Sequence, residues 1–339
     1  MSKITATIFI CANILRSFSD HSAGLNVTPT PWQQAIQPLP TAVAATLPEK
    51  RLPPAYLVTP MKVLQSDKYS EGVVFDREGN LYFSQTKAGT ITVLKVDGSR
   101  SIWAAVGGAN GHKIMPDGTH IVAAKNSVVQ LDRNGKLLKV IAKEFNGKPL
   151  QYPNDITIDP QGGFYFTDSG DSNPQLSNGA VYYVNSTGKI NSVVTGIAFA
   201  NGIVLSSDRK HLFVSESHRN RVLVYDVRSQ GKVGPQKVVA NLPVKQGEQI
   251  DNQPDGMCLD ATGNLYVAHY GMRQVEVISS KGQLVRRYSS GNLTTSNCAF
   301  GGANLDHLFV TGGLETEDGL GGIFRLDLDV PGLNILPQR

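Results

Sequence analysis

The stretch that decides the fold is DGMCLDATGNLYVAH, residues 255–269. A polar residue and a glycine precede a short apolar strand, a turn with Asp260 and Gly263 follows, and a second apolar strand ends at His269. Two apolar strands joined by an Asp/Gly turn predict a β-hairpin. The same phrase occurs five more times, at residues 71–85, 110–124, 154–168, 201–217 and 297–313. The first residues of successive copies are 39, 44, 47, 54 and 42 residues apart, which is the length of a β-propeller blade.

A third apolar strand follows most copies, for instance at residues 90–96, 128–132, 181–185, 221–226 and 274–279, and a fourth fits at 101–106 and 137–142. Six copies of a four-stranded unit predict an all-β, six-bladed β-propeller. Residues 56–64, ahead of the first copy, supply an outer strand for the last blade, so that no sheet edge stays free. A β-helix is the structural alternative, but its repeats are much shorter than this period.

Composition supports one large β domain and excludes several classes of protein. Of 339 residues, 40% are hydrophobic, 18% are charged and 34 are glycine, which excludes disorder and fibrous structure and favours many turns. The net charge is only +4, and no long run of Lys or Arg occurs. A nucleic-acid-binding protein needs a concentrated basic face, so we expect no nucleic-acid partner. The three cysteines show no metal-binding spacing, and we expect Cys258 and Cys298 to be small buried side chains.

The N-terminal part differs from the repeats. Residues 1–24 combine Lys3, an apolar stretch too short to cross a bilayer and small residues at 22–24, which is typical of a cleaved export signal. We therefore predict a secreted or periplasmic protein, with a cytoplasmic location as the alternative. Residues 25–55 are rich in proline and read as an extended linker, and the propeller occupies residues 56–339.

The six residues that begin the repeats all carry a side-chain oxygen. Because the innermost strand of each blade begins beside the central channel, we expect these side chains to meet at one opening. Carboxylate and amide oxygens without His or Cys suit a hard cation such as Ca²⁺, whereas Zn²⁺ prefers nitrogen and sulfur ligands. Asn and Asp before Gly are also common turn formers, which is the simpler explanation for any one of them. The six residues are Glu71, Asn110, Asn154, Asn201, Asp255 and Asn297.

The second strand of each hairpin returns to the same rim, so we expect its last residues to form an outer ring around the ion. Asp168, Glu216 and His269 are candidates there for binding substrate or moving protons. Solvated strand ends or hydrogen-bond partners of the inner ring are the alternative. The six residues of this predicted outer ring are Gln85, Asn126, Asp168, Glu216, His269 and Thr311.

The motifs together resemble the gluconolactonase, regucalcin (senescence marker protein) and lactonase family of six-bladed propellers. The resemblance covers residues 56–333, and its most specific phrases are PDGMCLD at 254–260 and CAFGG at 298–302. Shorter matches are Ser70-Glu71-Gly72, Pro153-Asn154-Asp155, Ala200-Asn201-Gly202 and the closing Val330-Pro331-Gly332-Leu333.

The resemblance implies a metal-dependent lactone hydrolase. The family's metal ligands fall on Glu71, Asn201 and Asp255, and Asn154 matches an amide that contacts metal or substrate. It implies Ca²⁺, with Zn²⁺, Mn²⁺ or Mg²⁺ as other divalent candidates. The cation would polarise the lactone carbonyl, and Asp255 would take a proton from the attacking water. We expect the substrate to be contacted by Asn110, Tyr152, Asn154, Asp168 and His269.

Two departures from the family pattern leave the substrate open. Family members that act on sugar lactones often carry an Arg where this chain has Tyr152, and an acid near the positions of Asp168 and Asp171 at slightly different spacing. The second hypothesis is an aryl ester or a phosphotriester as substrate, since the similar diisopropylfluorophosphatase propellers use the same kind of oxygen cradle. Tyr152 in place of Arg makes the pocket less polar and favours this hypothesis. A third hypothesis is a non-catalytic propeller with a structural calcium. The chain contains no G-x-S-x-G phrase, so no serine nucleophile is expected.

Overall fold

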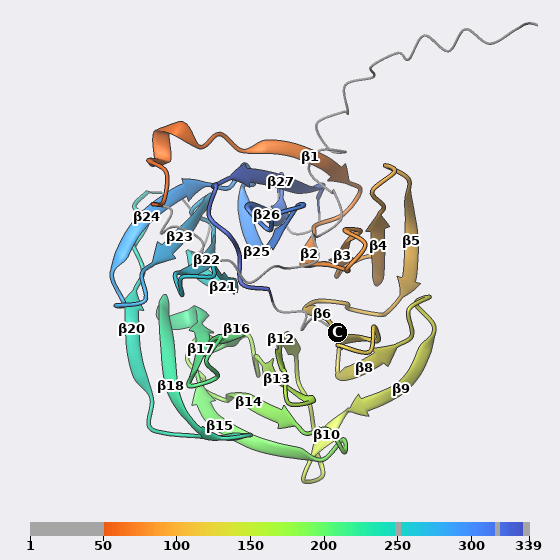
Figure 1. The fold of residues 1–339 in the computed structure, drawn as a ribbon. Helices are drawn as coiled ribbons and strands as arrows, with labels where there is room; N and C mark the ends of the chain where they lie inside the picture. Colours follow the sequence, from red (N-terminus) through yellow and green to blue (C-terminus); the bar gives the residue numbers. More distant parts are fainter. Residues whose placement is uncertain (1–50, 248–251, 316–318, 335–339) are drawn as a thin grey trace, which may run out of the picture.

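The computed structural model describes residues 51–247, 252–315 and 319–334, and these residues form a six-bladed β-propeller (Figure 1). The predicted fold class is therefore confirmed. Each blade is an antiparallel sheet whose first strand lies innermost. The predicted export signal at 1–24 and most of the predicted linker at 25–55 lie outside the described residues.

The first three blades follow one another along the chain. Blade 1 holds β2 (Glu71–Phe75), β3 (Leu81–Gln85), β4 (Thr90–Leu94) and β5 (Arg100–Ala105). Blade 2 holds β6 (His112–Ile114), β7 (His120–Ala124), β8 (Ser127–Leu131) and β9 (Leu137–Ala142). Blade 3 holds β12 (Pro153–Asp159), β13 (Gly163–Asp168), β14 (Gly179–Val184) and β15 (Ile190–Ile197), and a short hairpin of β10 (Glu144–Phe145) and β11 (Lys148–Pro149) precedes it.

The last three blades complete the ring. Blade 4 holds β16 (Ala200–Leu205), β17 (His211–Glu216), β18 (Arg221–Ser229) and β20 (Lys237–Asn241), with the two-residue β19 (Lys232–Val233) also paired to β18. Blade 5 holds β21 (Gln253–Leu259), β22 (Leu265–Tyr270), β23 (Gln274–Ile278) and β24 (Leu284–Ser289). Blade 6 holds β25 (Thr294–Gly301), β26 (His307–Gly313), β27 (Gly321–Asp327) and β1 (Met61–Ser66). The 3-10 helices η1 (Ala55–Leu57) and η2 (Ser217–Arg219) lie in connections.

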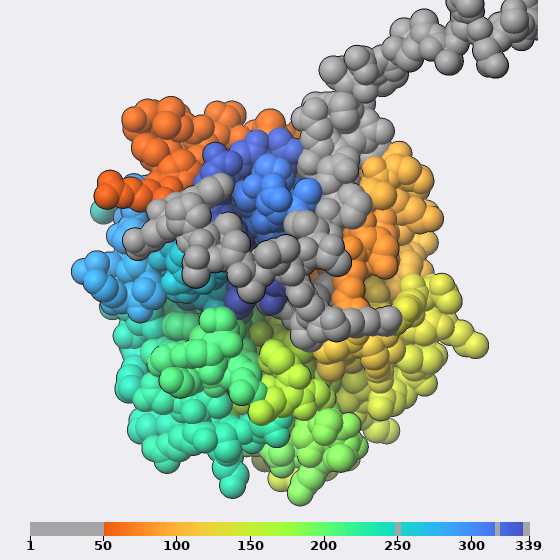
Figure 2. Space-filling model, viewed as in Figure 1, coloured from red at the N-terminus to blue at the C-terminus, as the bar shows by residue number. Residues whose placement is uncertain are grey.

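The ring closes as predicted, by an N-terminal strand on the last blade. β1 pairs antiparallel with β27, from Met61 opposite Arg325 to Ser66 opposite Gly321. Figures 1 and 2 show this closure as the N-terminal orange segment beside the C-terminal blue one. The strand begins at Met61 rather than at residue 56, because residues 56 and 57 belong to η1 and residues 58–60 have no regular structure. Pro53 anchors this lead-in by accepting a 2.8 Å hydrogen bond from the hydroxyl of Tyr288.

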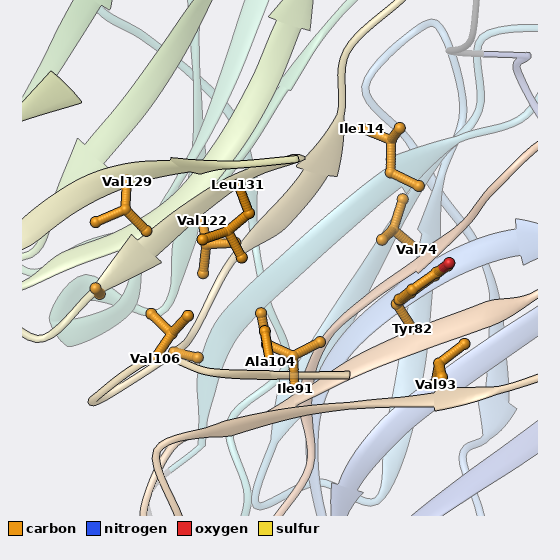
Figure 3. Packing of buried hydrophobic residues seen from close by; sticks show 12 residues of the cluster. Val74, Tyr82, Ile91, Val93, Ala104, Val106, Ile114, Val122, Val129 and Leu131 are labelled. Atoms are coloured by element: carbon orange, nitrogen blue, oxygen red, sulfur yellow. The ribbon is translucent and has the colours of Figure 1, made fainter. Parts of the chain in front are cut away.

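The hydrophobic core lies between neighbouring blades rather than in one central mass. In Figure 3, Val74 of blade 1 lies beside Ile114 of blade 2, and both belong to one buried cluster. Five further clusters fill the other five junctions, including the one where blade 6 meets blade 1. The structure therefore depends on every blade having a neighbour on both sides. No helix within residues 51–247, 252–315 or 319–334 has the length and apolar character needed to cross a membrane.

A buried histidine pair lies in the junction between blades 1 and 2. The ring nitrogens Nε2 of His112 and Nδ1 of His120 are 2.8 Å apart, and the rings pack against Tyr82 and Trp103. Burial lowers the pKa of His120 to about 4 and places the pKa of His112 well below its usual value. The pair is therefore neutral in the folded protein at neutral pH, with one ring donating and the other accepting.

We predict that this pair makes the protein acid-sensitive. Since the histidine pKa values are lower in the folded than in the unfolded chain, the unfolded chain binds more protons as the pH falls from about 6.5 to about 4. The free energy of unfolding should fall over that window by at least about 2–3 kcal/mol more in the wild type than in a His112→Leu/His120→Leu variant. Urea unfolding at a series of pH values measures both slopes, and equal slopes would contradict the prediction.

Candidate functional site

Five of the six residues that begin the repeats line one cavity of about 140 Å³ at the centre of the ring. Each is buried, with at most 8% of its surface exposed. The cavity, called here the oxygen-lined cavity, thus collects side chains from five of the six blades. These five residues are Glu71, Asn110, Asn154, Asn201 and Asp255.

A local irregularity of the inner strands aims these side chains at the channel. In blade 4, Ala200 is opposite Glu216 and Ile203 is opposite Val214, so Asn201 and Gly202 together face only Ser215. The same two-against-one arrangement occurs at Asn154 in β12 and at Asp255 in β21. In β2 the irregularity comes one residue later, after the pairing of Glu71 with Ser84. Such bulges turn a side chain away from the regular alternation of a strand.

Asn297 does not line the oxygen-lined cavity, which corrects the prediction of six converging side chains. In blade 6 the register shift comes one residue earlier, at Ser296, and Asn297 lies directly opposite Thr311. Its Oδ1 accepts a 2.8 Å hydrogen bond from the backbone N–H of Cys298. The repeated phrase located Asn297 correctly along the chain but could not reveal this shift in pairing.

The glycines after the leading residues let neighbouring inner strands touch. A Cβ on Gly202 would lie 2.1 Å from the backbone oxygen of Asp255, and a Cβ on Gly72 would lie 2.0 Å from that of Asn110. These distances are far below a van der Waals contact, so no side chain fits. The glycines are therefore required by close approach between blades as well as by turns.

Hydrogen bonds from hydroxyl groups stabilise the same contacts between neighbouring blades. Thr167 donates a 2.7 Å hydrogen bond to the backbone oxygen of Asn201 in the next blade. Ser215 makes the equivalent 2.7 Å bond to the backbone oxygen of Asp255. Each donor lies on the second strand of one blade and holds the leading residue of the next, which fixes the position of the oxygen-bearing side chains.

The side-chain oxygens of Glu71 and Asn201 differ in their hydrogen-bond partners. The carboxylate of Glu71 accepts hydrogen bonds from the Tyr69 hydroxyl and the Gly72 N–H, both at 3.2 Å. The Oδ1 of Asn201 is buried and has no hydrogen-bond partner among the described residues. A buried carbonyl oxygen without a donor is costly and needs an explanation, which a cation would provide.

Residues two positions before the leading residues form the wall of the cavity. Tyr69, Tyr152, Phe199 and Gln253 each line it, in front of Glu71, Asn154, Asn201 and Asp255 respectively. Tyr152 is thus in the cavity as predicted, whereas the other three were not anticipated. The sequence signal was available, because their spacing from the leading residues is the same as that of Tyr152.

The aromatic part of the wall includes a strained residue. Phe199 has a φ of 61°, a backbone conformation that costs a bulky side chain about 1–3 kcal/mol. The centroid of its ring lies 6.4 Å from that of Tyr152 and 4.8 Å from that of His218. Strain of this kind is concentrated at functional sites, and here it accompanies an aromatic ring that lines the oxygen-lined cavity.

Asp168 lies outside the cavity lining and binds the backbone of the loop that carries Tyr152. Its carboxylate oxygens accept hydrogen bonds from the backbone N–H groups of Gln151, at 3.0 Å, and Tyr152, at 2.7 Å. Asp168 therefore holds the backbone next to the oxygen-lined cavity, and the predicted contact of Asp168 with substrate stays a prediction.

His269 is also outside the cavity lining, although the sequence predicted a substrate contact. Its side chain is fully buried, 3.2 Å from Glu276 through Nδ1 and 2.9 Å from Asn220 through Nε2. Side chains alternate along a strand, so the next residue, Tyr270, faces the cavity instead. Blade 1 shows the same displacement: Thr86 and Lys87, the residues that follow the predicted Gln85, line the cavity, and Gln85 does not.

The remaining residues of the predicted outer ring also lie outside the oxygen-lined cavity. The Glu216 carboxylate accepts a 3.0 Å hydrogen bond from the Ala198 N–H and pairs with Arg221. Gln85 accepts a hydrogen bond from Thr92, and Thr311 lies 3.0 Å from Ser296. Asn126 donates to the backbone oxygen of Gln151. These groups serve structural hydrogen bonds.

A second cavity of about 170 Å³ has a different character. It is lined mainly by apolar side chains of the inner strands, such as Val74, Val204 and Met257, with the thiols of Cys258 and Cys298. It shares no residue with the oxygen-lined cavity. Because its lining offers few oxygen donors, this apolar cavity is not where a hard cation would bind.

Comparison with known proteins agrees with this geometry. The family described as "SMP-30/Gluconolactonase/LRE-like region" matches residues 69–313, which include the five oxygen-bearing residues. The chain belongs to this SMP-30/gluconolactonase family. The predicted family is thereby confirmed.

Two relatives and one solved structure are similar to this chain. A gluconolactonase of Zymomonas mobilis is 28% identical over 72% of this chain and 76% of its own length. Lactonase drp35 of Staphylococcus saprophyticus is 30% identical over 74% of this chain and 76% of its own. The calcium-binding protein regucalcin of Agrobacterium tumefaciens superposes with a TM-score of 0.68 at 21% identity, covering 79% of this chain and 92% of the regucalcin, and shows a common fold.

We predict that Gly202→Ala disrupts the ring at the candidate site. The added Cβ would meet the backbone oxygen of Asp255 at 2.1 Å, and backbone cannot move aside cheaply. The free energy of unfolding should fall by about 3 kcal/mol or more. Gly107→Ala is the matched control, because a Cβ there has no atom within 4 Å. Urea unfolding should show Gly107→Ala within about 1 kcal/mol of wild type, and two variants of equal stability would contradict the close-approach argument.

Proposed function

We propose that this protein hydrolyses lactones in the oxygen-lined cavity with the help of a bound divalent cation, Ca²⁺ being the first candidate. Membership of the SMP-30/gluconolactonase family and relatives named as gluconolactonase and lactonase support the reaction class. The buried, unpartnered Oδ1 of Asn201 is the observation that supports the cation. Mn²⁺, Mg²⁺ and Zn²⁺ are the other candidates, with Zn²⁺ disfavoured by the donor set.

The residues present fit a hard cation. Glu71 and Asp255 supply negative charge, and Asn154 and Asn201 supply neutral amide oxygens from two other blades. Among the residues that the structure describes, the cavity lining holds only these two carboxylates, so the amide oxygens would be needed as further ligands of the proposed cation. Ca²⁺ accepts about six to eight oxygens, which leaves coordination positions for water and substrate.

The chain's own groups have distinct tasks in this proposal. The cation, when bound, acts as a Lewis acid that polarises the lactone carbonyl and stabilises negative charge on its oxygen. A carboxylate oxygen of Asp255 accepts a proton from the attacking water and returns it to the alcohol that leaves the ring. Tyr152 and Phe199 cover one side of the cavity and restrict water, while Asn110, Thr86 and Lys87 offer polar contacts to the substrate.

A second candidate substrate class is an aryl ester or a phosphotriester. The observation in its favour is the aromatic pair of Tyr152 and Phe199 at the cavity wall, with ring centroids 6.4 Å apart. An aromatic wall suits a flat apolar group better than a sugar ring with many hydroxyls. A non-catalytic propeller with a structural calcium is the remaining alternative.

Export by residues 1–24 stays a prediction, which the mass of the mature protein tests.

The proposed function predicts metal-dependent acid release. Purified protein should lower the pH of a gluconolactone solution, lose this activity after dialysis against a chelator and regain it with Ca²⁺. Asp255→Asn should lower the rate by at least about 100-fold, because it removes the proton acceptor. Parallel assays on an aryl ester and a phosphotriester separate the two substrate classes. Full activity after chelation would exclude the cation, and Ca²⁺ binding without turnover of any substrate would favour the non-catalytic alternative.

A pair of asparagine variants tests the cation site without an activity assay. Asn201→Ala removes an unpartnered buried oxygen, so the metal-free protein should be as stable as wild type or slightly more stable. Its Ca²⁺ affinity, measured by calorimetry, should fall by at least about 10-fold, since a ligand is lost. Asn110→Ala, which alters the same cavity outside the proposed ligand set, is the control and should bind Ca²⁺ like wild type. Equal affinity of both variants would refute this ligand assignment.

A further inference from the structure

The apolar cavity contains a pair of thiols that the proposed hydrolysis does not use. Cys258 lies in β21 of blade 5 and Cys298 in β25 of blade 6, 40 residues apart in sequence. Their Sγ atoms are 3.3 Å apart, and both cysteines are free thiols in the structure. We propose that Cys258 and Cys298 are a modification site at which a peroxide produces a disulfide bond between blades 5 and 6.

The geometry requires only a small movement. A disulfide bond is about 2.05 Å long, so the two sulfurs need to approach by roughly 1.2 Å. The two inner strands are already in contact beside the cysteines, because a Cβ on Gly256 would lie 2.3 Å from Cγ of Asn297. β21 and β25 belong to different sheets, so a bond here would join blades that share no strand pairing at this point (Figure 1).

The apolar cavity gives a small oxidant a place to react. Its volume of about 170 Å³ is similar to that of engineered cavities of about 150 Å³ that hold benzene, so a neutral peroxide fits. Cys298 is almost fully buried and Cys258 is partly exposed, and both line this cavity. Lys113, also in the lining, contributes a positive charge that favours the thiolate of Cys258.

The reaction balances with the peroxide as the only oxidant. One thiolate attacks a peroxide oxygen, which breaks the O–O bond and gives a sulfenic acid and, after proton transfer, one water. The second sulfur then attacks the sulfenic sulfur and displaces the hydroxyl group as a second water. Two thiols lose two electrons, and the peroxide gains them. Burial raises the pKa of the Cys258 thiol, so the thiolate fraction is small and we expect a reaction over minutes to hours.

Peptide mapping after peroxide treatment tests the proposal. Wild-type protein is treated with millimolar hydrogen peroxide, alkylated under denaturing conditions and digested without reductant. We expect a linked pair of peptides containing Cys258 and Cys298, about 2 Da lighter than their sum and separated again by dithiothreitol. Digestion to peptides is needed because methionine oxidation would hide this change in the intact mass.

The outcomes separate this site from ordinary thiol oxidation. Cys258→Ser and Cys298→Ser should give no such linked peptide, and the remaining thiol of each should gain oxygen atoms. A link from either cysteine to Cys11, the third cysteine of the sequence, or oxygen added to Cys258 or Cys298 without a link, would overturn the proposal. As a second measurement, peroxide should raise the urea unfolding midpoint of the wild type but not that of Cys258→Ser/Cys298→Ser, because the bond restricts the unfolded chain. An unchanged or lowered wild-type midpoint would also overturn it.

Discussion

The close approach of neighbouring inner strands is the constraint on which the rest of the structure depends. Gly202 lies so near the backbone oxygen of Asp255 that even a methyl group would not fit. The same strand bulges at Asn201, and that bulge turns its amide into the channel. One local feature therefore does two things. It packs the blades around a narrow axis, and it brings carboxylates and amides from separate blades to one cavity.

The distribution of the core explains why closure matters. Each hydrophobic cluster lies at a junction between two blades, so an open ring would leave two apolar faces in water. The pairing of β1 with β27 removes the free edge and completes blade 6. The contact of Pro53 with Tyr288 extends this closure to blade 5. The lead-in to the first strand is thus part of the folded ring, although its composition resembles a linker.

The repeat was sufficient to predict the blades but only part of the site. Strand β9 lies at the predicted residues 137–142, and the closing strand is on the predicted blade. The position of Asn297 depends on a shift of one residue in strand pairing, which has no signature in a single sequence. His269 and Asp168 bond to Asn220 and to the Tyr152 backbone, partners that only the folded chain identifies.

A further group of residues was missed although its signal was present. Tyr69, Phe199 and Gln253 precede leading residues by two positions, as Tyr152 does. Tyr69, Tyr152 and Phe199 lie just before the inner strands β2, β12 and β16, so their common spacing from the leading residues is the signal, and strand periodicity is not. The strained backbone of Phe199, in contrast, is visible only in the structure. The chemistry of the donors was therefore predictable from residue type, whereas the shape of the wall was not.

The origin of the oxygen donors links the proposed cation to the stability of the whole ring. Glu71, Asn154, Asn201 and Asp255 come from blades 1, 3, 4 and 5, and no two of them share a sheet. A cation held by all four would bind the folded ring and not the unfolded chain, so its binding free energy adds to the stability of the ring. Without it, two carboxylates and an unpartnered amide oxygen are held close together in a buried cavity, which opposes folding. Under this proposal the side chains oppose folding by themselves, and a cation bound to them would stabilise the ring.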